Sequence, residues 1–526
     1  MISKIKNFIK NDWQYLTFGI ILLIITLLIA TINYNSEETP YVVNTPFSSV
    51  YGLVSWSLVL ILGISGIFLF KNASKDGIRL EKKYLLIAIP IGIIMVFVTP
   101  LGRIPDEVAH ARKAAAISQG NIFSVADEEG VAKDMLNSKI NELVSISTTT
   151  YEEYIERLNL AETEEKVEMS YNTMALYAPI CHLPQALGML ITRLLGFGIS
   201  VQCFAARFAN LAVAIFLIYN AIKFIPYKKS LVLFLGLLPL TFNISSTISS
   251  DSLTFALSLF YIAYILYLKY SFKGDTYTKK ELAIIYTSTI ILSLCKIVYL
   301  PLCFLLIVLP KEKFGSMKKK IISLSIVISI SIILNLMWLI YCTRFLIEFN
   351  PGVNSKDQLI YILTNPFEYL LIMFRTINFH FNIYIAHTCG DGLGLYCVKA
   401  PEMFIYACTA LITLFFFKKD EQNDLKIDLF TKIIFFLVFA CIVVLIYTSL
   451  YIQWNPVKYP MITGVQARYF LPILFLVAVF LDNDKLILKE NINRYLLCFL
   501  LFFNLALINA TMYTYYFGVL VDGYIK

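Results

Sequence analysis

The sequence predicts an all-α polytopic membrane protein, and three observations support this prediction. The 526 residues are 58% hydrophobic and only 15% charged, whereas soluble domains carry about a quarter charged residues. The apolar residues form continuous runs of spanning length, which is typical of transmembrane helices and not of alternating barrel strands. Basic residues collect in short loops between these runs, as in cytoplasmic loops, and this distribution accounts for the net charge of +8. The composition excludes a disordered chain, a fibre and a nucleic-acid-binding domain.

The first spans follow from the loop charges. The run at about 15–32 has spanning length and no small-residue cleavage site, so we expect it to remain as a helix. The lysines before it place the N-terminus in the cytoplasm. The next spans are expected at about 50–70 and 84–99, with a basic loop between them. The third span therefore ends outside, at the sequence TPLGRIPDEVAHARKAA.

The largest polar segment, 101–171, follows this span, and its many acidic residues fit the outer face. The stretch 171–198 is apolar but is broken by Pro179 and Pro184. If it crossed the membrane, the lysines near 228 would lie outside. We therefore interpret it as an interfacial or re-entrant helix.

One later stretch, 282–310, lies between two basic loops and carries Lys296 and Pro301 near its middle. It is predicted to form two half-length helices, which membranes tolerate only where the break is buried in protein or lines a cavity. The other spans are expected at about 204–224, 231–246, 253–269, 321–341, 403–417, 433–451, 470–481 and 495–515. The loop at 451–470 then falls outside.

The chain is thus predicted to be one membrane domain, 1–526, of about a dozen helices with a large first extracellular loop. Its parts are two extra N-terminal spans (1–83), the span leading to the acidic motif (84–100), the outer loop with interfacial helices (101–202), the core spans (203–342, with the broken hairpin at 282–310), a second outer loop (343–402) and the C-terminal spans (403–526).

The informative polar residues are predicted to lie on the outer face. The first group is Arg103, Asp106, Glu107, His110 and Arg112. Two carboxylates after a proline also suit a helix N-terminus, so capping is the alternative role. Against this, residues four apart share a helix face, which aims a carboxylate (Asp106) and an imidazole (His110) at one point.

The remaining candidates are single residues near expected span ends or breaks. Each has a structural alternative: packing for a histidine, an interfacial anchor for an arginine, or a helix cap for an aspartate. A lysine in mid-membrane needs an anion, and a lipid phosphate is the natural one. These candidates are Tyr177, His182, Arg207, Asp251, Lys296, Tyr299, Gln466, Arg468 and Tyr469.

The ten cysteines include no CxxC pair, so neither a zinc site nor a disulfide framework is indicated. Cys389 and Cys397 enclose a glycine-rich loop that is flexible enough to close a disulfide in an oxidising exterior. The spacing does not decide whether this disulfide forms.

The order of these motifs resembles the GT-C membrane glycosyltransferases. An outward span is followed by PDEVAHAR, a long outer loop, a Tyr-x-Pro helix, ARFAN and a hairpin ending in SSD. PDE-x-x-H together with GVQARYFLP looks most like a bacterial multipass membrane family of largely unassigned function. The likeness runs from about 85 to 481. Where the dolichyl-mannose type often has His-Pro-Pro, this chain has Tyr-Ala-Pro at 177–179, which leaves the acceptor class open.

The resemblance implies a transferase that moves a sugar from a polyprenyl-phosphate sugar to an extracytoplasmic acceptor, with inversion. The acceptor is a cell-wall or surface polysaccharide or a lipid-linked glycan, and the site faces outward in a bacterial plasma membrane. Asp106 takes the place of the general base and Glu107 is its neighbour. Lys296, Arg468 and Arg207 are the candidate phosphate-binding cations. Members differ over a divalent cation (Mg²⁺ or Mn²⁺); Asp106, Glu107 and His110 are its candidate ligands here.

The residues themselves agree with this chemistry. Inverting transfer needs one base beside the acceptor oxygen and electrostatic help for a departing phosphate, which is already a good leaving group. The alternatives are a polysaccharide polymerase or ligase, a lipid-sugar flippase or transporter, and a non-catalytic scaffold. Transporters tend to place ionisable residues at the midplane between matching halves, and this sequence shows no such halves. A defined short acceptor would separate single addition from polymerisation.

Overall fold

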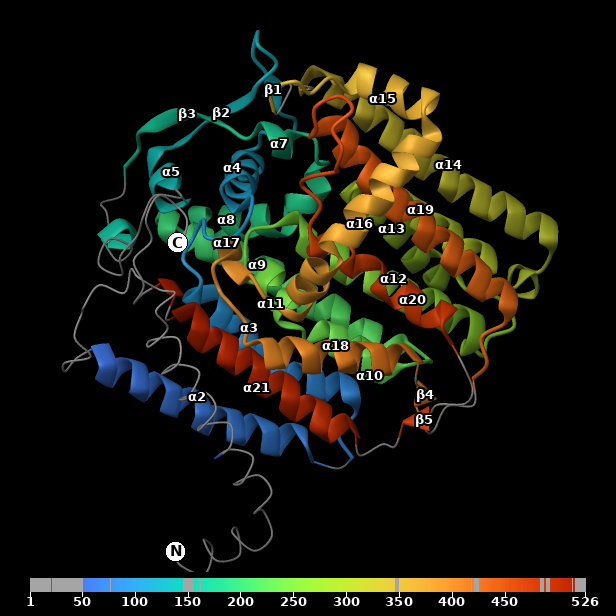
Figure 1. Cartoon of the computed structure of the whole chain (residues 1–526), viewed down its shortest axis with the longest axis horizontal. Coiled ribbons are helices and arrows are strands. Elements are labelled where there is room, and N and C mark those ends of the chain that lie inside the picture. Colours follow the sequence, from blue (N-terminus) through green and yellow to red (C-terminus); the bar gives the residue numbers. More distant parts are fainter. Residues whose placement is uncertain are drawn as a thin grey trace, which may run out of the picture.

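Helices form most of the part of the chain that the computed structural model describes (Figure 1). The described residues are 20, 51–75, 77–144, 156–159, 163–345, 350–417, 419–420, 425–482, 487–488, 492–512 and 514–515. The predicted N-terminal span at 15–32 lies outside this part.

The elements of the first half of the chain are α2 (Tyr51–Ala73), α3 (Leu80–Val98), α4 (Glu107–Ser118), β1 (Val125–Ala126), β2 (Ala132–Asn137), α5 (Ser138–Val144), β3 (Lys166–Ser170), α7 (Asn172–Ala175), η1 (Pro179–His182), α8 (Leu183–Leu194), α9 (Ile199–Phe224), α10 (Lys229–Gly236), α11 (Pro239–Ser245) and α12 (Ser250–Tyr270). Those of the second half are α13 (Lys279–Cys295), η2 (Ile297–Val308), η3 (Lys311–Phe314), α14 (Met317–Cys342), η4 (Thr343–Phe345), α15 (Ser355–Thr364), α16 (Pro366–Cys389), α17 (Leu393–Tyr396), α18 (Glu402–Phe417), β4 (Lys419–Asp420), α19 (Leu429–Gln453), η5 (Ala467–Tyr469), η6 (Leu471–Ile473), α20 (Leu474–Phe480), β5 (Ile487–Leu488) and α21 (Ile492–Met512).

The membrane character of the fold is confirmed, whereas the number of spans is not. Five helices of the described chain are long and apolar enough to cross a membrane: 199–224, 250–270, 317–345, 429–453 and 493–512. Shorter apolar helices include Leu60–Ala73, Glu402–Phe417 and Ala467–Phe480. The predicted dozen transmembrane helices therefore stays a prediction.

The first polar segment adds a small sheet to a fold that is otherwise helical, in agreement with the predicted all-α class. Strands β1, β2 and β3 form a small antiparallel sheet there, with Lys133 opposite both Val125 and Ser170. The stretch 171–198 after it is made of short pieces, α7, η1 and α8, with Pro179 and Pro184 at helix starts, where proline is tolerated. Its interfacial position stays a prediction.

The span expected at 231–246 is not one helix. It divides into α10 and α11, and Leu238 between them has an extended backbone (φ −60°, ψ 143°). Pro239 explains the break, because proline disfavours helical conformation in the residue before it and cannot donate a backbone hydrogen bond.

The break predicted within 282–310 is present at Lys296. Its backbone is extended (φ −152°, ψ 126°), and the flanking pieces α13 and η2 pack against each other. The segment 343–402, in contrast, is less loop-like than expected, because α16 alone has 24 residues.

Contacts at the ends of α14 and α19 show which connecting segments lie at the same end of the molecule. At the start of α19, Asp428 pairs with Lys269 at 2.6 Å, and after its other end the carbonyl of Trp454 accepts from Asn350 at 2.7 Å. Trp338, near the end of α14, donates to a carbonyl of the 171–198 stretch. The segments predicted to be extracytoplasmic therefore lie together, as Figure 1 shows for β1–β3 and α15. Which end faces the exterior stays a prediction.

Candidate functional site

Four charged side chains from distant parts of the sequence form one cluster, which we call the charge quartet: Asp106, Asp251, Lys296 and Arg468. A guanidinium nitrogen of Arg468 donates to Asp106, and Nε of Arg468 lies 3.2 Å from Oδ2 of Asp251. Lys296 donates to Oδ1 of Asp251. The quartet thus alternates in sign and carries no net charge.

Each member of the quartet lies at a helix start, at a break between helices or in a 3-10 turn. Asp106 precedes α4, Asp251 lies in the first turn of α12, Lys296 lies at the break between α13 and η2, and Arg468 lies in the 3-10 turn η5. Because α12 is long and apolar enough to span a membrane, the quartet lies at the end of a candidate span. Charged groups there require partners, and each one has them.

The two aspartates differ in access. The side chain of Asp106 is 45% exposed, whereas that of Asp251 is 7% exposed. Asp106 has a left-handed backbone (φ 68°) and its side chain makes no capping hydrogen bond to α4. The capping alternative is also wrong for Asp251, because the side chain of Ser249 accepts from the Asp251 backbone N–H and caps α12. Asp106 is therefore the carboxylate of the quartet that an incoming molecule can reach.

Aromatic rings surround the ammonium group of Lys296. Its Nζ lies 5.3 Å from the ring centre of Tyr177 and 4.9 Å from that of Tyr469, which is within the range of cation–π contacts. The hydroxyl of Tyr299 donates to the Tyr469 carbonyl at 2.7 Å and so fixes η5 against the broken hairpin. The sequence-predicted residues Tyr177, Tyr299 and Tyr469 thus all belong to the site.

The two predicted histidines contact each other beside the quartet. Nδ1 of His110 lies 2.7 Å from Nε2 of His182, and both side chains are buried. Burial lowers the pKa of His110 to about 4 and places that of His182 well below its ordinary value, so both rings are neutral near pH 7. The ring of His110 is 6.1 Å from that of Tyr177.

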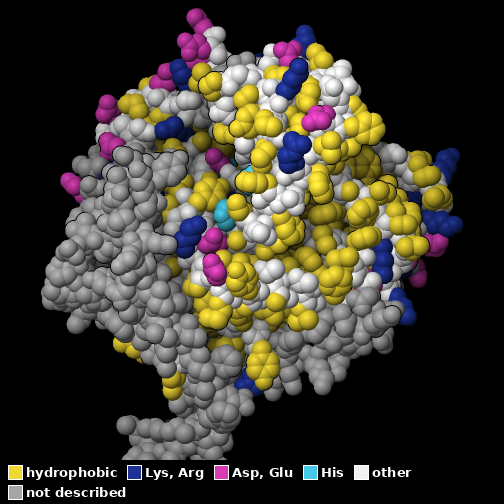
Figure 2. All heavy atoms as spheres, in the orientation of Figure 1, with side chains coloured by type: hydrophobic (Ala, Val, Ile, Leu, Met, Phe, Trp, Pro, Cys, Tyr) yellow, Lys and Arg dark blue, Asp and Glu magenta, His cyan; other side chains and the backbone are white. Residues whose placement is uncertain are grey.

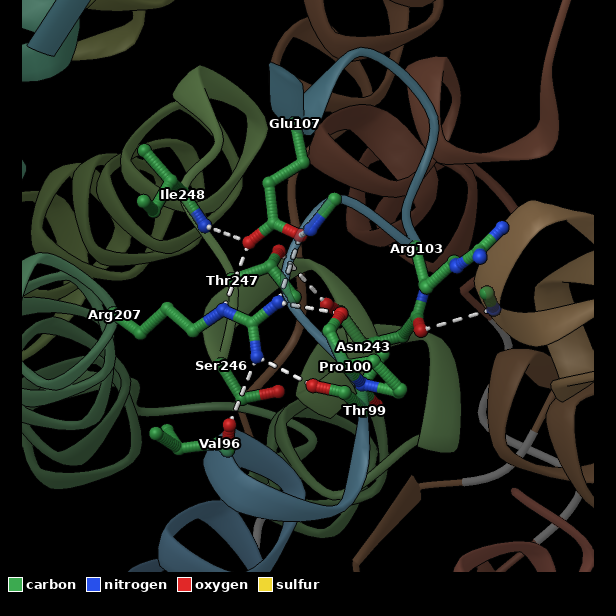
Figure 3. A network of polar contacts seen from close by, with 12 residues as sticks. Val96, Thr99, Pro100, Arg103, Glu107, Arg207, Asn243, Ser246, Thr247 and Ile248 are labelled. Carbon is green, nitrogen blue, oxygen red and sulfur yellow. Dashed lines mark hydrogen bonds and ion pairs between the residues drawn. The ribbon is translucent and has the colours of Figure 1, made fainter. Parts of the chain in front are cut away.

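Glu107 and Arg207 form a separate, fully buried ion pair (Figure 3). Oε2 of Glu107 lies 2.7 Å from Nη2 of Arg207 and also accepts from the Gly102 backbone, while Oε1 accepts from Nε of Arg207 and from the Ile248 backbone. The remaining donors of Arg207 bond three backbone carbonyls at the end of α3 and just after it, those of Val96, Thr99 and Pro100. The pair therefore ties α3, α4, α9 and the α11–α12 turn together.

Two other candidates lie apart from the quartet or at its margin. Arg112 donates to the Ser170 carbonyl at 2.8 Å and to Asn141 at 2.6 Å, so it braces the first polar segment. Gln466 precedes η5, and its side-chain oxygen is buried without a hydrogen-bond partner among the described residues.

Sequence reasoning missed Tyr396. Tyr396 is 43% exposed, and the charges of Arg468, Asp106 and Asp251 act on its hydroxyl, which places it beside the quartet. Its ring stacks on His387 with centres 5.4 Å apart. The signal in the sequence is the glycine-rich loop at 390–394, which brings the chain back toward the site between Cys389 and Cys397. Cys389 and Cys397 form no disulfide with each other in the structure, and Cys389 contacts Thr409 instead.

The described residues include no group of three or more histidine, cysteine, aspartate or glutamate side chains placed to hold a metal ion. Figure 2 shows acidic, basic and histidine side chains gathered near the middle of one face, with hydrophobic side chains over much of the surface around them. This surface is what a membrane-embedded protein with a polar site presents.

Fold and site together define a helical membrane protein with a charged site at the end of a candidate span. The chain belongs to the family described as predicted membrane protein (DUF2142), whose model matches residues 90–477. The matched region contains the whole charge quartet and both histidines. No curated protein matches the chain, and no solved structure matches it.

Proposed function

We propose that this protein is a GT-C-type membrane glycosyltransferase that transfers a sugar from a polyprenyl-phosphate sugar to an acceptor hydroxyl at the extracytoplasmic face. The observation that supports this most is a half-exposed carboxylate, Asp106, that pairs with Arg468 at the end of an apolar helix. A second cation, Lys296, lies beside it, because Asp251 contacts both Lys296 and Arg468. A base and a phosphate-binding site are the two things that this reaction needs from a protein.

Asp106 is assigned as the general base. The acceptor oxygen attacks the anomeric carbon, the bond from that carbon to the phosphate oxygen breaks, and the acceptor proton passes to the Asp106 carboxylate. The polyprenyl phosphate leaves with the bonding electron pair. The product sugar is inverted, and the proton is later lost to solvent, which reaches Asp106 because its side chain is 45% exposed.

Arg468 and Lys296 are assigned to the phosphate. Arg468 presents a planar set of donors suited to phosphate oxygens, and Lys296 adds a point charge held between two aromatic rings. Asp251 keeps the two cations side by side, because one carboxylate contacts both. A phosphate entering the site exchanges one of these carboxylate contacts for its own oxygens.

Glu107 and Arg207 serve the site indirectly in this proposal. Both carboxylate oxygens of Glu107 accept hydrogen bonds within the protein, and all three guanidinium nitrogens of Arg207 donate them. We therefore assign them to holding the backbone on both sides of Asp106, and not to proton transfer or to phosphate. Of the three predicted ligands of a divalent cation, Glu107 is fully engaged with Arg207 and backbone groups, and the described residues form no group of three placed to hold a metal ion.

The test uses purified protein in lipid nanodiscs with a radiolabelled polyprenyl-phosphate sugar and a short oligosaccharide acceptor. Transfer of one sugar that disappears in Asp106→Asn supports the proposal, and a ladder of products indicates a polymerase. Movement of the lipid-linked sugar between leaflets without transfer would contradict the proposal and favour a flippase.

A further inference from the structure

The first polar segment exposes a group of hydrophobic side chains just before and within β1. We call Ile122, Phe123 and Val125 the apolar cluster. Phe123 is 63% exposed and Val125 is 73% exposed, whereas Ser124 between them is buried. A contiguous apolar surface in a segment that is otherwise rich in acidic residues indicates a contact with an apolar partner.

The outward face of the small sheet extends this cluster. On β2, Ala132 and Leu136 are buried. Because successive strand residues point to opposite faces, Lys133 and Met135 face outward. Val125 pairs with Lys133 and therefore shares that face, and Met135 is also exposed. The outward face of an antiparallel sheet in water normally carries polar side chains, whereas this one presents Val125 and Met135.

The apolar cluster lies against the end of a candidate span. The ring of Phe123 packs edge to face with that of Tyr341, with ring centres 5.8 Å apart. Tyr341 lies in the last turn of α14, and its hydroxyl donates to the backbone carbonyl of Ser124. Only 22% of the apolar stretch of this span is buried within the molecule, so a membrane-spanning α14 contacts lipid along most of its length. The cluster therefore continues a lipid-facing surface.

The side chains around this contact are typical of a membrane–water interface. The rings of Trp338 and Tyr341 have centres 5.0 Å apart, and the guanidinium of Arg344 lies 5.3 Å from the centre of the Tyr341 ring. Tryptophan, tyrosine and arginine suit the level where acyl chains meet headgroups, because each has an apolar body and a polar end. Ile340, beside them on α14, is exposed.

We propose that the apolar cluster inserts into the interfacial region of the bilayer beside α14, so that the first polar segment is docked on the membrane and does not stand free in water. The partner is the lipid itself, because the cluster is continuous with the surface that α14 presents to lipid. The acidic turn of the same hairpin, which contains Asp127, Glu128 and Glu129, stays in water. This inference depends neither on the proposed function nor on which membrane face carries the segment.

Ser124 connects the membrane contact to the charge quartet. Its hydroxyl accepts a hydrogen bond from the ammonium of Lys113, which is fully buried on α4, and its carbonyl accepts one from Tyr341. Helix α4 begins directly after Asp106. Docking of the cluster therefore fixes the depth of α4, and with it that of Asp106, relative to the bilayer.

Spin labels can measure the depth of the cluster. Of the ten cysteines only Cys397 and Cys441 are not buried, so a Cys397→Ser/Cys441→Ser background directs the label to an introduced cysteine. The labelled protein is placed in nanodiscs of phosphatidylcholine and phosphatidylglycerol. Oxygen dissolves in acyl chains and a nickel chelate stays in water, so the ratio of their collision rates with the label rises with depth.

Cysteines at Phe123 and Val125 are compared with two controls of known exposure. Ile333 is exposed on the middle of α14, and Glu129 is exposed on the hairpin turn. We expect the oxygen-to-nickel ratio at both cluster positions to exceed that at Glu129 and to approach that at Ile333. A ratio at both positions equal to that at Glu129 would overturn the proposal. Low collision rates with both reagents would also overturn it, because protein and not lipid would then cover the cluster.

Substitutions at Phe123 test the cause of insertion, with the label kept at Val125. Phe123→Asp should lower the ratio toward the value at Glu129, because a carboxylate is costly at this depth. Phe123→Trp is the matched control and should keep the ratio, since tryptophan suits the interface. The unfolding temperature of each variant, compared with that of the background, checks that the fold is intact. An unchanged ratio in a folded Phe123→Asp protein would overturn the inference that this cluster inserts.

Discussion

Arg468 and Lys296 contact opposite oxygens of the same buried carboxylate, that of Asp251. The chain brings these residues together from η5, from a break after α13 and from the first turn of α12. Since Arg468 also contacts Asp106, the position of the proposed base depends on the same set of contacts. The quartet is therefore one connected set of ion pairs. Because its members differ in solvent exposure, substitutions can distinguish their roles.

Asp106→Asn tests the base. The amide keeps the shape of the side chain but cannot accept a proton at neutral pH, so turnover is expected to fall by about two to four orders of magnitude. Thermal stability should change little, because Asp106 makes no capping hydrogen bond. Turnover and the unfolding temperature are measured on the same preparation. Full activity in Asp106→Asn would move the base to another residue.

Lys296→Met tests the phosphate contact. Loss of one charge-assisted contact is expected to weaken binding of polyprenyl phosphate by about one to two orders of magnitude, since such contacts contribute about 1.5–3 kcal/mol. The substitution also leaves Asp251 with one cation, which should destabilise the protein. Lys296→Met/Asp251→Asn also removes the carboxylate that has lost one of its two cations. Stability should recover in the double variant and binding should not; recovery of both would show that Lys296 serves only as a counter-ion.

Glu107→Gln tests the assignment of the buried ion pair shown in Figure 3. Breaking one side of a buried pair typically costs about 3–5 kcal/mol, because the other charge stays buried without compensation. We expect a clear fall in the unfolding temperature, with Glu142→Gln at an exposed carboxylate as the matched control that changes it little. Unchanged stability with lost turnover in Glu107→Gln would instead make Glu107 a catalytic residue.

The histidine pair predicts a pH dependence of stability. His110 has a pKa of about 4 in the folded protein, against about 6.5 when unfolded. Between these values the unfolded chain binds more protons, so stability is fully present above about pH 6.5 and is lost as pH falls toward 4. The slope is at most about 1.4 kcal/mol per pH unit for one such group. The His110→Gln/His182→Gln variant should show a flatter profile from pH 7 to 5, and an identical profile would contradict this.

Topology is tested by labelling single cysteines introduced at Glu142 and Lys458, which are both exposed. An impermeant thiol reagent should label both on intact cells, whereas cysteines at Lys273 and Lys318 should react only after lysis. A Cys441→Ser background removes an exposed native thiol. The reverse pattern would invert the topology and place the quartet on the cytoplasmic face.

Local chemistry made much of this site predictable. Charge is costly near a membrane, which makes Lys296 and Asp251 candidates from the sequence, and the structure pairs them with each other. The break at Lys296 was likewise visible from flanking basic loops and a mid-run proline. The partners themselves were not visible, because ion pairs between residues far apart in sequence depend on packing that no local pattern records.

The predictions that differ from the structure have the same cause, which is that distant contacts leave no local pattern in the sequence. Glu107 and Arg207 have the residue types of a catalytic pair, and only the surrounding carbonyls reveal a closed network. Leu231–Ser246 has the composition of a span, and Pro239 near its middle was the signal for the division into two helices. The strands β1–β3 are short and lie in a polar segment, where alternation over a few residues does not distinguish a strand from a loop.

The left-handed backbone at Asp106 has a consequence for protein engineering. A non-glycine residue in this conformation costs about 1–2 kcal/mol, whereas glycine adopts it freely. Asp106→Gly is therefore expected to raise the unfolding temperature while abolishing transfer. A selection for thermostable variants would enrich this substitution, and a selection for growth would remove it. Position 106 would then be a place where stability and activity exclude each other.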